Sequence, residues 1–474
     1  MEDILKDASS LEGTFDSPAI PAKWYSSDMD GIGKAPVAVD VNWGVNALDA
    51  MLVTGFNKNT TSLFEYTEST KTLKVVFATN TNYVKHSIIA ITGTGDAVLD
   101  TEHRVIDQGV NYFTIKLPKD PTPAALTKTG VEVKYASLGW EVAFSKGTRR
   151  VYRSKNANGT RPYVVVEGGR LINKAYASMI HFAMSTAMED MYTATEDAFT
   201  CPYNTTRTFG MAEKDMNANK FDFFISSFST QSYESYRINP NGTPKPWVFF
   251  GDDRLFTWVT YPMFYNNSYG YDCTPHTITV GDIEPEMSWD KGATGIGGGF
   301  LCSKAYIRDG NASSNEGYDD YHNHYAQSSW LFRSSGSNFN YLIDYEGYNR
   351  GREVGGLRGG SLNGGILYSG YATYSAPSVY GMKVFLTKPE YMMAVSPSAG
   401  VSVRGKFPSG IHWVMSKIPW ITETEPVIVE NLKGYEGTVF LSVPWMYRFR
   451  DAWWASNKDY LCRIMVDISK NTWR

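Results

Sequence analysis

The residues best suited to bind a metal lie in one short run, Asp319-Asp320-Tyr321-His322-Asn323-His324. His322 and His324 are two positions apart, so on a strand both side chains would project from one face, where Asp320 could join them. The same residue types are also common in solvated turns, and the run lies in a stretch rich in glycine, serine and asparagine. The sequence therefore names these three residues as a metal candidate but assigns no metal to them.

Other patterns for chemistry are incomplete. Asp252 and Asp253 are adjacent, whereas glycoside hydrolysis needs two carboxylates that face each other across a sugar. Gly31-Ile32-Gly33-Lys34 lacks the spacing, the hydroxyl and the preceding strand of a nucleotide-binding loop. The chain has no Gly-x-Ser-x-Gly nucleophile motif. We therefore expect no catalytic residue, no cofactor and no enzyme activity.

The cysteines give no sign of a shared site. The chain has 4 of them, far apart and without paired spacing: Cys201, Cys273, Cys302 and Cys462. That pattern argues against a zinc ribbon and against a disulfide framework. We expect reduced cysteines that are mostly buried.

Composition excludes several classes of protein. The 474 residues, 42% hydrophobic and 20% charged, are enough for several folded domains. A net charge of −4, with scattered Lys and Arg, gives no surface for tracking phosphates, so we expect no direct contact with nucleic acid. The first seven residues do not resemble a secretory signal, and no apolar run is long enough to span a membrane. We expect a soluble protein made in a cytoplasm.

One helix is expected, within 44–56. Val45, Leu48, Met51 and Leu52 recur at spacings of three and four residues, so they can pack on one face while Asn46 and Asp49 remain in water. Gly55 is expected to end the helix. These apolar residues are expected to pack on the small β domain that follows.

The remaining pattern is typical of strands, and the high aromatic share of 14% fits pleated sheets. Strands are expected at 72–77, 87–91, 111–117, 131–135, 150–153, 163–166, 247–250, 382–386, 438–443 and 462–468, and the ambiguous stretch 175–184 is also interpreted as a strand. The fold class is therefore mainly β and multi-domain, with a small N-terminal β domain that carries one short helix and larger β-sandwich-like regions after it.

Turn formers and prolines suggest the domain limits. Pro118, Pro121 and Pro123 favour an extended linker, and Trp24 and Tyr25 are the expected anchors of a polar N-terminal segment. The expected division is an extended arm at 1–34, a small β domain at 35–118, a linker at 119–130, a β-rich domain at 131–290, a Gly/Tyr/Ser-rich insertion at 291–375, and a C-terminal β-rich region at 376–474 that completes the second domain.

Several short blocks together resemble a family of tailed-bacteriophage virion structural proteins. They occur in the family's order: Ala35-Pro36 through 48–56, Gly139-Trp140, Val151-Tyr152-Arg153-Ser154, Pro246-Trp247 with 251–256, Gly281-Asp282-Ile283, and 404–411. The N-terminal arm, the insertion and the end around Trp453-Trp454 depart from the family pattern. The resemblance implies a tail, neck or collar component.

Three functions follow as hypotheses. The first is a non-enzymatic virion component, made in the host cytoplasm, that forms a ring or trimer with its own copies and docks to other tail, neck or capsid proteins. In that hypothesis the arm buries Trp24 and Tyr25 against a neighbouring subunit. The alternative is a receptor-binding or carbohydrate-binding module in which the insertion contacts host glycans through exposed aromatic residues. The third is a polysaccharide-degrading enzyme.

Overall fold

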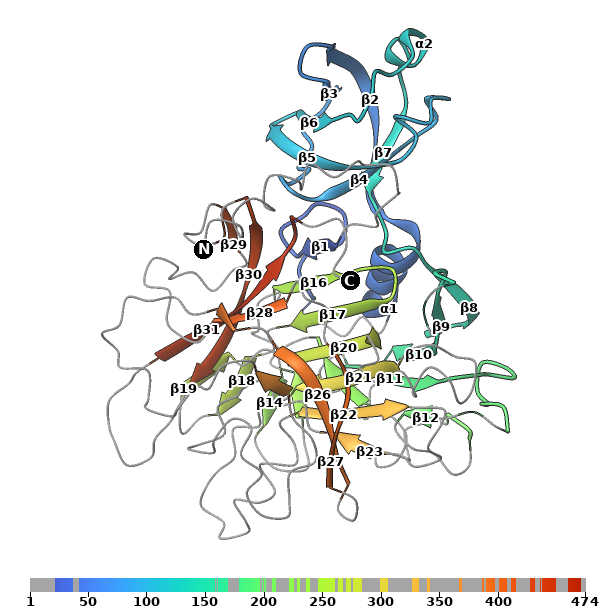
Figure 1. Cartoon of the computed structure of the whole chain (residues 1–474), viewed down its shortest axis with the longest axis vertical. Coiled ribbons are helices and arrows are strands. Elements are labelled where there is room, and N and C mark those ends of the chain that lie inside the picture. Colours follow the sequence, from blue (N-terminus) through green and yellow to red (C-terminus); the bar gives the residue numbers. More distant parts are fainter. Residues whose placement is uncertain are drawn as a thin grey trace, which may run out of the picture.

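A computed structural model gives the arrangement of the chain (Figure 1). It describes residues 22–36, 42–157, 159, 161–168, 179–196, 198, 200–201, 207–209, 221–225 and 246–260, and otherwise the strands bounded below with a few adjoining residues up to Ser469. The fold is mainly β, as the sequence predicts, with several sheets and a short helix near the N-terminus. No helix in this described part is long and apolar enough to cross a membrane.

The first sheet is a closed barrel that stands at one end of the molecule (Figure 1). Its strands follow one another in space in the order β2 (Phe56–Thr67), β3 (Thr72–Phe77), β6 (Tyr112–Lys116), β5 (Glu102–Gly109), β4 (Ile88–Thr92) and β7 (Glu132–Tyr135). Alternation explains the barrel: in β3, Leu73, Val75 and Phe77 are buried while the residues between them are partly exposed.

The barrel extends further along the chain than the expected small β domain. The stretch 119–130, expected to be an extended linker, holds a short helix, α2 (Pro123–Leu126), with Pro123 in its first turn. The chain then returns as β7, which pairs with β2 and with β4 and so closes the barrel. The prolines are compatible with this path because Pro is tolerated where a helix begins.

The expected helix is present and has two parts. α1 (Trp43–Leu48) continues into a π-helical turn, η2 (Asp49–Thr54), which ends with Gly55 donating its N–H to the Ala50 carbonyl. Gly55 has φ +72°, a left-handed conformation that suits glycine at a helix end. Leu48, Met51 and Leu52 are fully buried. The helix lies against β8 (Trp140–Lys146), β10 (Tyr163–Gly168) and β11 (Met179–Ser185) of a second sheet, and not on the small β domain as predicted.

That second sheet has six strands. Its order is β12 (Thr200–Cys201), β11 (Met179–Ser185), β10 (Tyr163–Gly168), β9 (Arg149–Ser154) and β8 (Trp140–Lys146), with β13 (Phe221–Phe224) also paired to β11. The ambiguous stretch 175–184 is a strand from Met179 onward, as predicted; residues 175–178 lie outside the described part.

A seven-stranded sheet forms the centre of the body (Figure 1). Its order is β1 (Lys23–Ser26), β16 (Trp247–Gly251), β17 (Leu255–Thr260), β20 (His276–Ile283), β21 (Gly299–Ala305), β22 (Ala326–Leu331) and β23 (Phe339–Tyr341). Two expectations change here. The segment 23–26, expected in an extended arm, is an edge strand of this sheet, and the expected loop-heavy insertion supplies three of its strands.

Three smaller sheets complete the described structure. One joins β15 (Tyr236–Ile238), β14 (Phe228–Thr230), β18 (Met263–Asn266) and β19 (Gly270–Cys273), and another joins β24 (Ile366–Tyr368), β26 (Pro389–Ser396) and β27 (Gly400–Lys406). The C-terminal sheet has the order β25 (Leu386–Thr387), β28 (Ile411–Val414), β31 (Asp459–Asp467), β30 (Val439–Arg448) and β29 (Val427–Glu430). β30 and β31 confirm the strands expected at 438–443 and 462–468, whereas residues 382–385 lie outside the described part.

One hydrophobic core runs through the barrel, β1, the helix and the larger sheets. The core contains a continuous series of aromatic rings whose neighbouring centroids lie about 5 to 6 Å apart, a spacing at which rings attract one another. The chain runs Phe113, Tyr83, Tyr135, Phe56, Tyr25, Phe249, Trp258, Phe223 and Phe182. The barrel is therefore packed onto the body and is not a module tethered by a flexible linker.

Candidate functional site: a buried junction at Asp252 and Asp253

The tight turn between β16 and β17 contains both adjacent carboxylates that the sequence analysis considered. The Asp252 carboxylate accepts hydrogen bonds from the backbone N–H groups of Arg254 and Leu255, each at 2.8 Å. The Asp252 N–H in turn donates to the Leu255 carbonyl at 2.8 Å. Asp252 is 5% exposed, so this carboxylate is buried and shapes the turn.

The second carboxylate connects the turn to the six-stranded sheet. Asn156 donates its side-chain amide to the Asp253 carboxylate at 2.7 Å, and the Ser154 hydroxyl donates to the Asp253 carbonyl at 2.6 Å. The buried Trp140 indole N–H donates to the Asp252 carbonyl at 3.3 Å, and its ring meets Phe256 edge to face at 5.4 Å. Two sheets are thus joined through one turn by directional bonds.

A second set of polar contacts joins the helix to the same sheet. The Asp49 carboxylate accepts from the Tyr152 hydroxyl at 2.8 Å and from the Arg150 guanidinium at 3.0 Å. Burial raises the pKa of the Tyr152 hydroxyl, and the nearby Asp49 charge raises it further. Asp49, expected to remain in water, is instead partly buried because the helix packs on the six-stranded sheet, where Arg150 and Tyr152 of β9 contact it. Asn46 is exposed, as expected.

Glycines allow the strands of this junction to approach closely. Gly281 in β20 has φ +136°, and a Cβ there would overlap the Arg254 carbonyl. A Cβ at Gly251 would overlap the Leu255 carbonyl. In α1, a Cβ at Gly44 would overlap the Ile180 side chain. No larger residue fits at these positions unless the neighbouring atoms move.

The blocks that carry the phage resemblance therefore meet in space. Asp49 of the helix block contacts Tyr152, and Trp140 and Ser154 both bond the Asp252–Asp253 turn, against which Gly281 packs. The exception is 404–411, whose side chains lie outside the described part of the chain. Chemically, the junction holds carboxylates that are already engaged by backbone and side-chain donors, so it organises sheets and presents no pair facing across a substrate.

A second junction attaches the barrel to the body through β1. The β1 backbone pairs with β16, while three successive side chains donate to the base of the barrel. The buried Lys23 ammonium bonds Glu102 at 2.6 Å and also the Ser137 carbonyl, Trp24 donates to the His86 carbonyl at 3.2 Å, and the Tyr25 hydroxyl donates to the Ala136 carbonyl. Trp24 and Tyr25 are 4% and 1% exposed within their own chain, so the expectation that they await a neighbouring subunit is wrong.

The other candidates are placed as follows. Asp319, Asp320, His322 and His324 lie outside the described residues. Among the residues that are described, no group of three or more His, Cys, Asp or Glu side chains could hold a metal ion. Gly31 and Gly33 form a turn with positive φ, and the Gly33 carbonyl accepts from the Trp247 indole at 2.7 Å, which gives this turn a packing role. The four cysteines lie in strands of four different sheets: β12, β19, β21 and β31.

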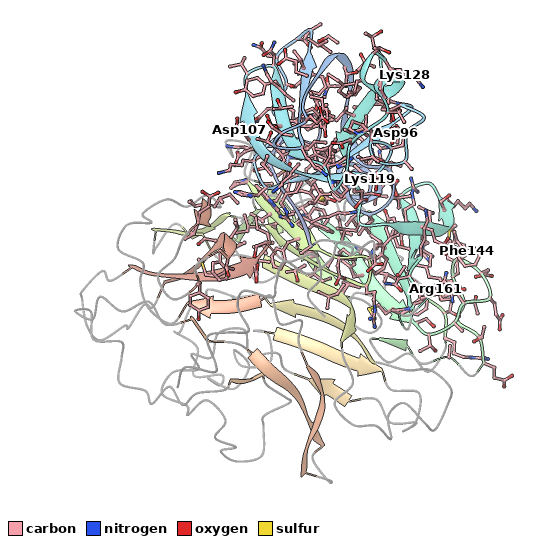
Figure 2. All side chains as sticks on the ribbon, turned by 45° about the horizontal axis from the view of Figure 1, so that its top comes forward. Asp96, Asp107, Lys119, Lys128, Phe144 and Arg161 are labelled. Carbon is pink, nitrogen blue, oxygen red and sulfur yellow. The ribbon has the colours of Figure 1, made fainter. Side chains whose placement is uncertain are left out.

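The barrel has its own carboxylate loop. Asp96 accepts from the backbone N–H groups of Thr122 at 2.6 Å and Val98 at 2.8 Å, and these bonds hold the pKa of its carboxyl below the ordinary value. Asp96, Lys119 and Lys128 lie across the barrel from Asp107 (Figure 2). This loop ties α2 to the barrel and leaves its carboxylate already satisfied.

Sequence reasoning missed Lys23, Glu102, Arg150 and Asp49 as contact residues. Their partners lie far away along the chain, and a single sequence contains no signal for such pairs. The series of blocks that resemble the phage family did provide a signal, because Trp140, Tyr152 and Asp252 all belong to these blocks and lie in the contacts described above.

Comparison with known proteins adds little to this geometry. No protein-family model matches the chain, and no curated protein matches it. Among solved structures, the chain is matched to a phage phi92 endosialidase at 10% identity, over 85% of this chain and 70% of that chain, with a TM-score of 0.17. A likeness at that TM-score carries no argument about fold or activity.

Proposed function

We propose that the chain is a non-enzymatic structural component of a tailed-bacteriophage virion, located in the tail, neck or collar. It acts by forming homo-oligomers and by docking to other virion proteins. The observation that carries the proposal is that the resembling blocks with described side chains contact one another at the Asp252–Asp253 turn and at the neighbouring Asp49–Tyr152 contact. Blocks that matched by chance would be scattered over the fold; these blocks build one scaffold.

The construction of the molecule supports the same role. The barrel and the body share one core, and β1 bonds to both. A continuous core resists relative movement of its parts, because separating them would expose closely packed apolar surface. A rigid shape of this kind suits a subunit that must present fixed surfaces to identical copies.

Analysis of purified particles tests the proposal. A nonsense mutation in the gene should give incomplete particles that lack the protein. Supplying the wild-type chain in trans should give complete particles that contain it. Mass spectrometry of the particles measures the chain and its copy number. Absence of the chain from complete, infectious particles would overturn the proposal.

The hypothesis of a polysaccharide-degrading enzyme is tested separately on the purified chain. Incubation with bacterial surface polysaccharide should release no reducing sugar, and sustained release would contradict the non-enzymatic role.

Glycan binding is tested by cell adsorption of the wild-type chain and of a variant lacking 297–371. On the barrel, the partly exposed Tyr112 ring has the Lys74 ammonium 4.7 Å from its centroid and packs against Gly109, so a sugar would compete with these neighbours for the ring.

A further inference from the structure

An ionic contact joins the barrel to the C-terminal sheet. Glu430, the last residue of β29, bonds the Lys85 ammonium at 2.8 Å and also contacts the His86 imidazole. Lys85 and His86 belong to the loop that precedes β4 of the barrel. β29 is the terminal strand of its sheet, paired with β30 in the described part of the chain, so Glu430 holds a sheet edge against the barrel.

Other charged groups surround this contact. From β5, Arg104 donates to the His86 carbonyl at 3.4 Å, and the same carbonyl accepts from Trp24 of β1 at 3.2 Å. Asp467, at the end of β31, lies close enough to act electrostatically on Arg104. The barrel therefore contributes Lys85, His86 and Arg104, and the C-terminal sheet contributes Glu430 and Asp467. The two surfaces have complementary charge.

We propose that Glu430 is half of a reversible electrostatic latch, which holds the edge strand β29 on the barrel near neutral pH and releases it on acidification or at high salt. The contact can be switched because its groups remain partly in water: the Glu430 and Lys85 side chains are 37% and 43% exposed. Ion pairs at such sites are weak and are screened by salt. The aromatic core that joins the barrel to the body does not depend on charge, so the barrel stays packed when the latch opens.

Protonation of Glu430 favours opening in acid, because it removes the negative charge that Lys85 and His86 contact. Hydrogen bonds from Lys85 and His86 lower the pKa of Glu430 below its ordinary 4.5. The contact with Glu430 favours the protonated form of His86, so protonation of this imidazole strengthens the contact and does not open it. The latched state thus binds fewer protons at Glu430. Its advantage is present above pH 4.5 and is lost as the pH falls through the lowered pKa of Glu430.

Hydrogen exchange of the full-length chain tests the latch. Amide protection of residues 84–87 and 427–430 would be measured by mass spectrometry from about pH 7.5 to about pH 3.5, corrected for intrinsic exchange, and at low and high salt. In the wild type, protection should fall with acid and with salt. In Glu430→Gln it should be about threefold to tenfold lower at neutral pH and should respond little to either condition.

Two further variants make the result specific. Lys85→Met removes the cation and should reproduce the neutral-pH loss of protection. Glu65→Gln breaks a comparable surface pair on the same barrel, Glu65–Lys74 at 3.0 Å, and should leave residues 84–87 and 427–430 as in the wild type. Circular dichroism establishes that each variant is folded. If Glu430→Gln and Lys85→Met both keep wild-type protection and its wild-type pH and salt response, the latch does not exist.

Discussion

Tyr25 and Phe56 meet edge to face, with 5.2 Å between their ring centroids and 72° between their ring planes. Phe56 begins the first barrel strand, and Tyr25 belongs to β1, at the edge of the seven-stranded sheet. Their contact is the step at which the aromatic chain passes from the barrel into the body. Together with the bond from the Tyr25 hydroxyl to the Ala136 carbonyl, it explains why a four-residue strand can fix the barrel in place.

Replacing Tyr25 should therefore weaken the attachment of the barrel and lower the free energy of unfolding. Tyr25→Phe keeps the ring but leaves the buried Ala136 carbonyl without this donor, at a cost of about 1 to 3 kcal/mol. Tyr25→Ala also removes the ring and should cost about 3 to 5 kcal/mol, as large aromatic truncations do. Urea unfolding, followed by fluorescence, measures both variants. Tyr66→Phe is the matched control, because Tyr66 also bonds through its hydroxyl, to Asp120, but is exposed to solvent there. Equal midpoints for Tyr25→Ala and the wild type would contradict this account.

The carboxylate of Asp49 should be coupled energetically to Arg150. It accepts from Arg150 and from Tyr152 in a partly buried setting, with the Asp49 and Arg150 side chains 25% and 19% exposed. A double-mutant cycle with Asp49→Ala and Arg150→Met should give a coupling free energy of about 0.5 to 2 kcal/mol. Lys58 and Glu132 provide the comparison, since Lys58 is 67% exposed and the coupling of that pair should be near zero. Strictly additive effects of Asp49→Ala and Arg150→Met would show that the contact does not stabilise the fold.

The local sequence pattern predicts much of this fold, because buried and exposed residues alternate along many of its strands. β3 shows the alternation over its whole length, and the helix was visible from Val45, Leu48, Met51 and Leu52. β1 was not visible as a strand: all four of its residues are buried, so it does not alternate, and its partner β16 lies more than 200 residues away. A single sequence does not encode such a pairing locally.

The junction was harder to predict than the elements around it. The sequence shows Asp252 and Asp253 as adjacent carboxylates, but adjacency does not indicate whether a carboxylate faces a ligand or its own backbone. The helical pattern by itself predicts that Asp49 faces water, because the sheet that covers this residue is built from residues about 100 positions later. Each correction arises from tertiary contacts that override the local pattern.

Glycine should be required at position 281 for two reasons: its φ angle is positive, and neighbouring backbone atoms leave no space for a Cβ. Gly281 and Gly93 both have left-handed φ, +136° and +97°, but a Cβ at Gly93 would meet nothing within 4 Å, whereas one at Gly281 would overlap backbone atoms of Arg254 and Leu255. Gly93→Ala should therefore cost about 1 kcal/mol from backbone strain alone, and Gly281→Ala at least about 3 kcal/mol. Thermal unfolding by calorimetry compares them, and similar losses for the two variants would disprove the steric explanation.

Acid should destabilise the barrel through His103. This side chain is 7% exposed, and its imidazole bonds the Leu99 carbonyl at 3.1 Å. Burial lowers its pKa below the ordinary 6.5, so the folded state binds this proton less readily than the unfolded chain does. The contribution is therefore present above pH 6.5 and is lost as the pH falls toward the folded-state pKa.

The Tm of the wild type should accordingly be lower at about pH 5.5 than at about pH 7.5, and His103→Gln should narrow that difference. Glu430→Gln in the same experiment separates the contribution of His103 from that of the contact at β29. If His103→Gln keeps the wild-type difference in Tm between the two pH values, His103 does not contribute to the loss of stability in acid.

The Asp252 carboxylate distinguishes a structural role from a catalytic one. Its oxygen accepts two backbone N–H groups, and the amide oxygen of asparagine can accept the same bonds. Asp252→Asn should therefore cost under about 1 kcal/mol, while Asp252→Ala leaves two buried donors without this acceptor and should cost about 2 to 4 kcal/mol. Denaturant unfolding measures stability, and complementation of a nonsense mutant measures particle assembly. Because a catalytic carboxylate does not tolerate loss of its charge, a stable Asp252→Asn chain that assembles into particles and still supports infection fits the scaffold role. A stable Asp252→Asn chain that assembles but leaves the particles non-infectious would point to chemistry at this turn.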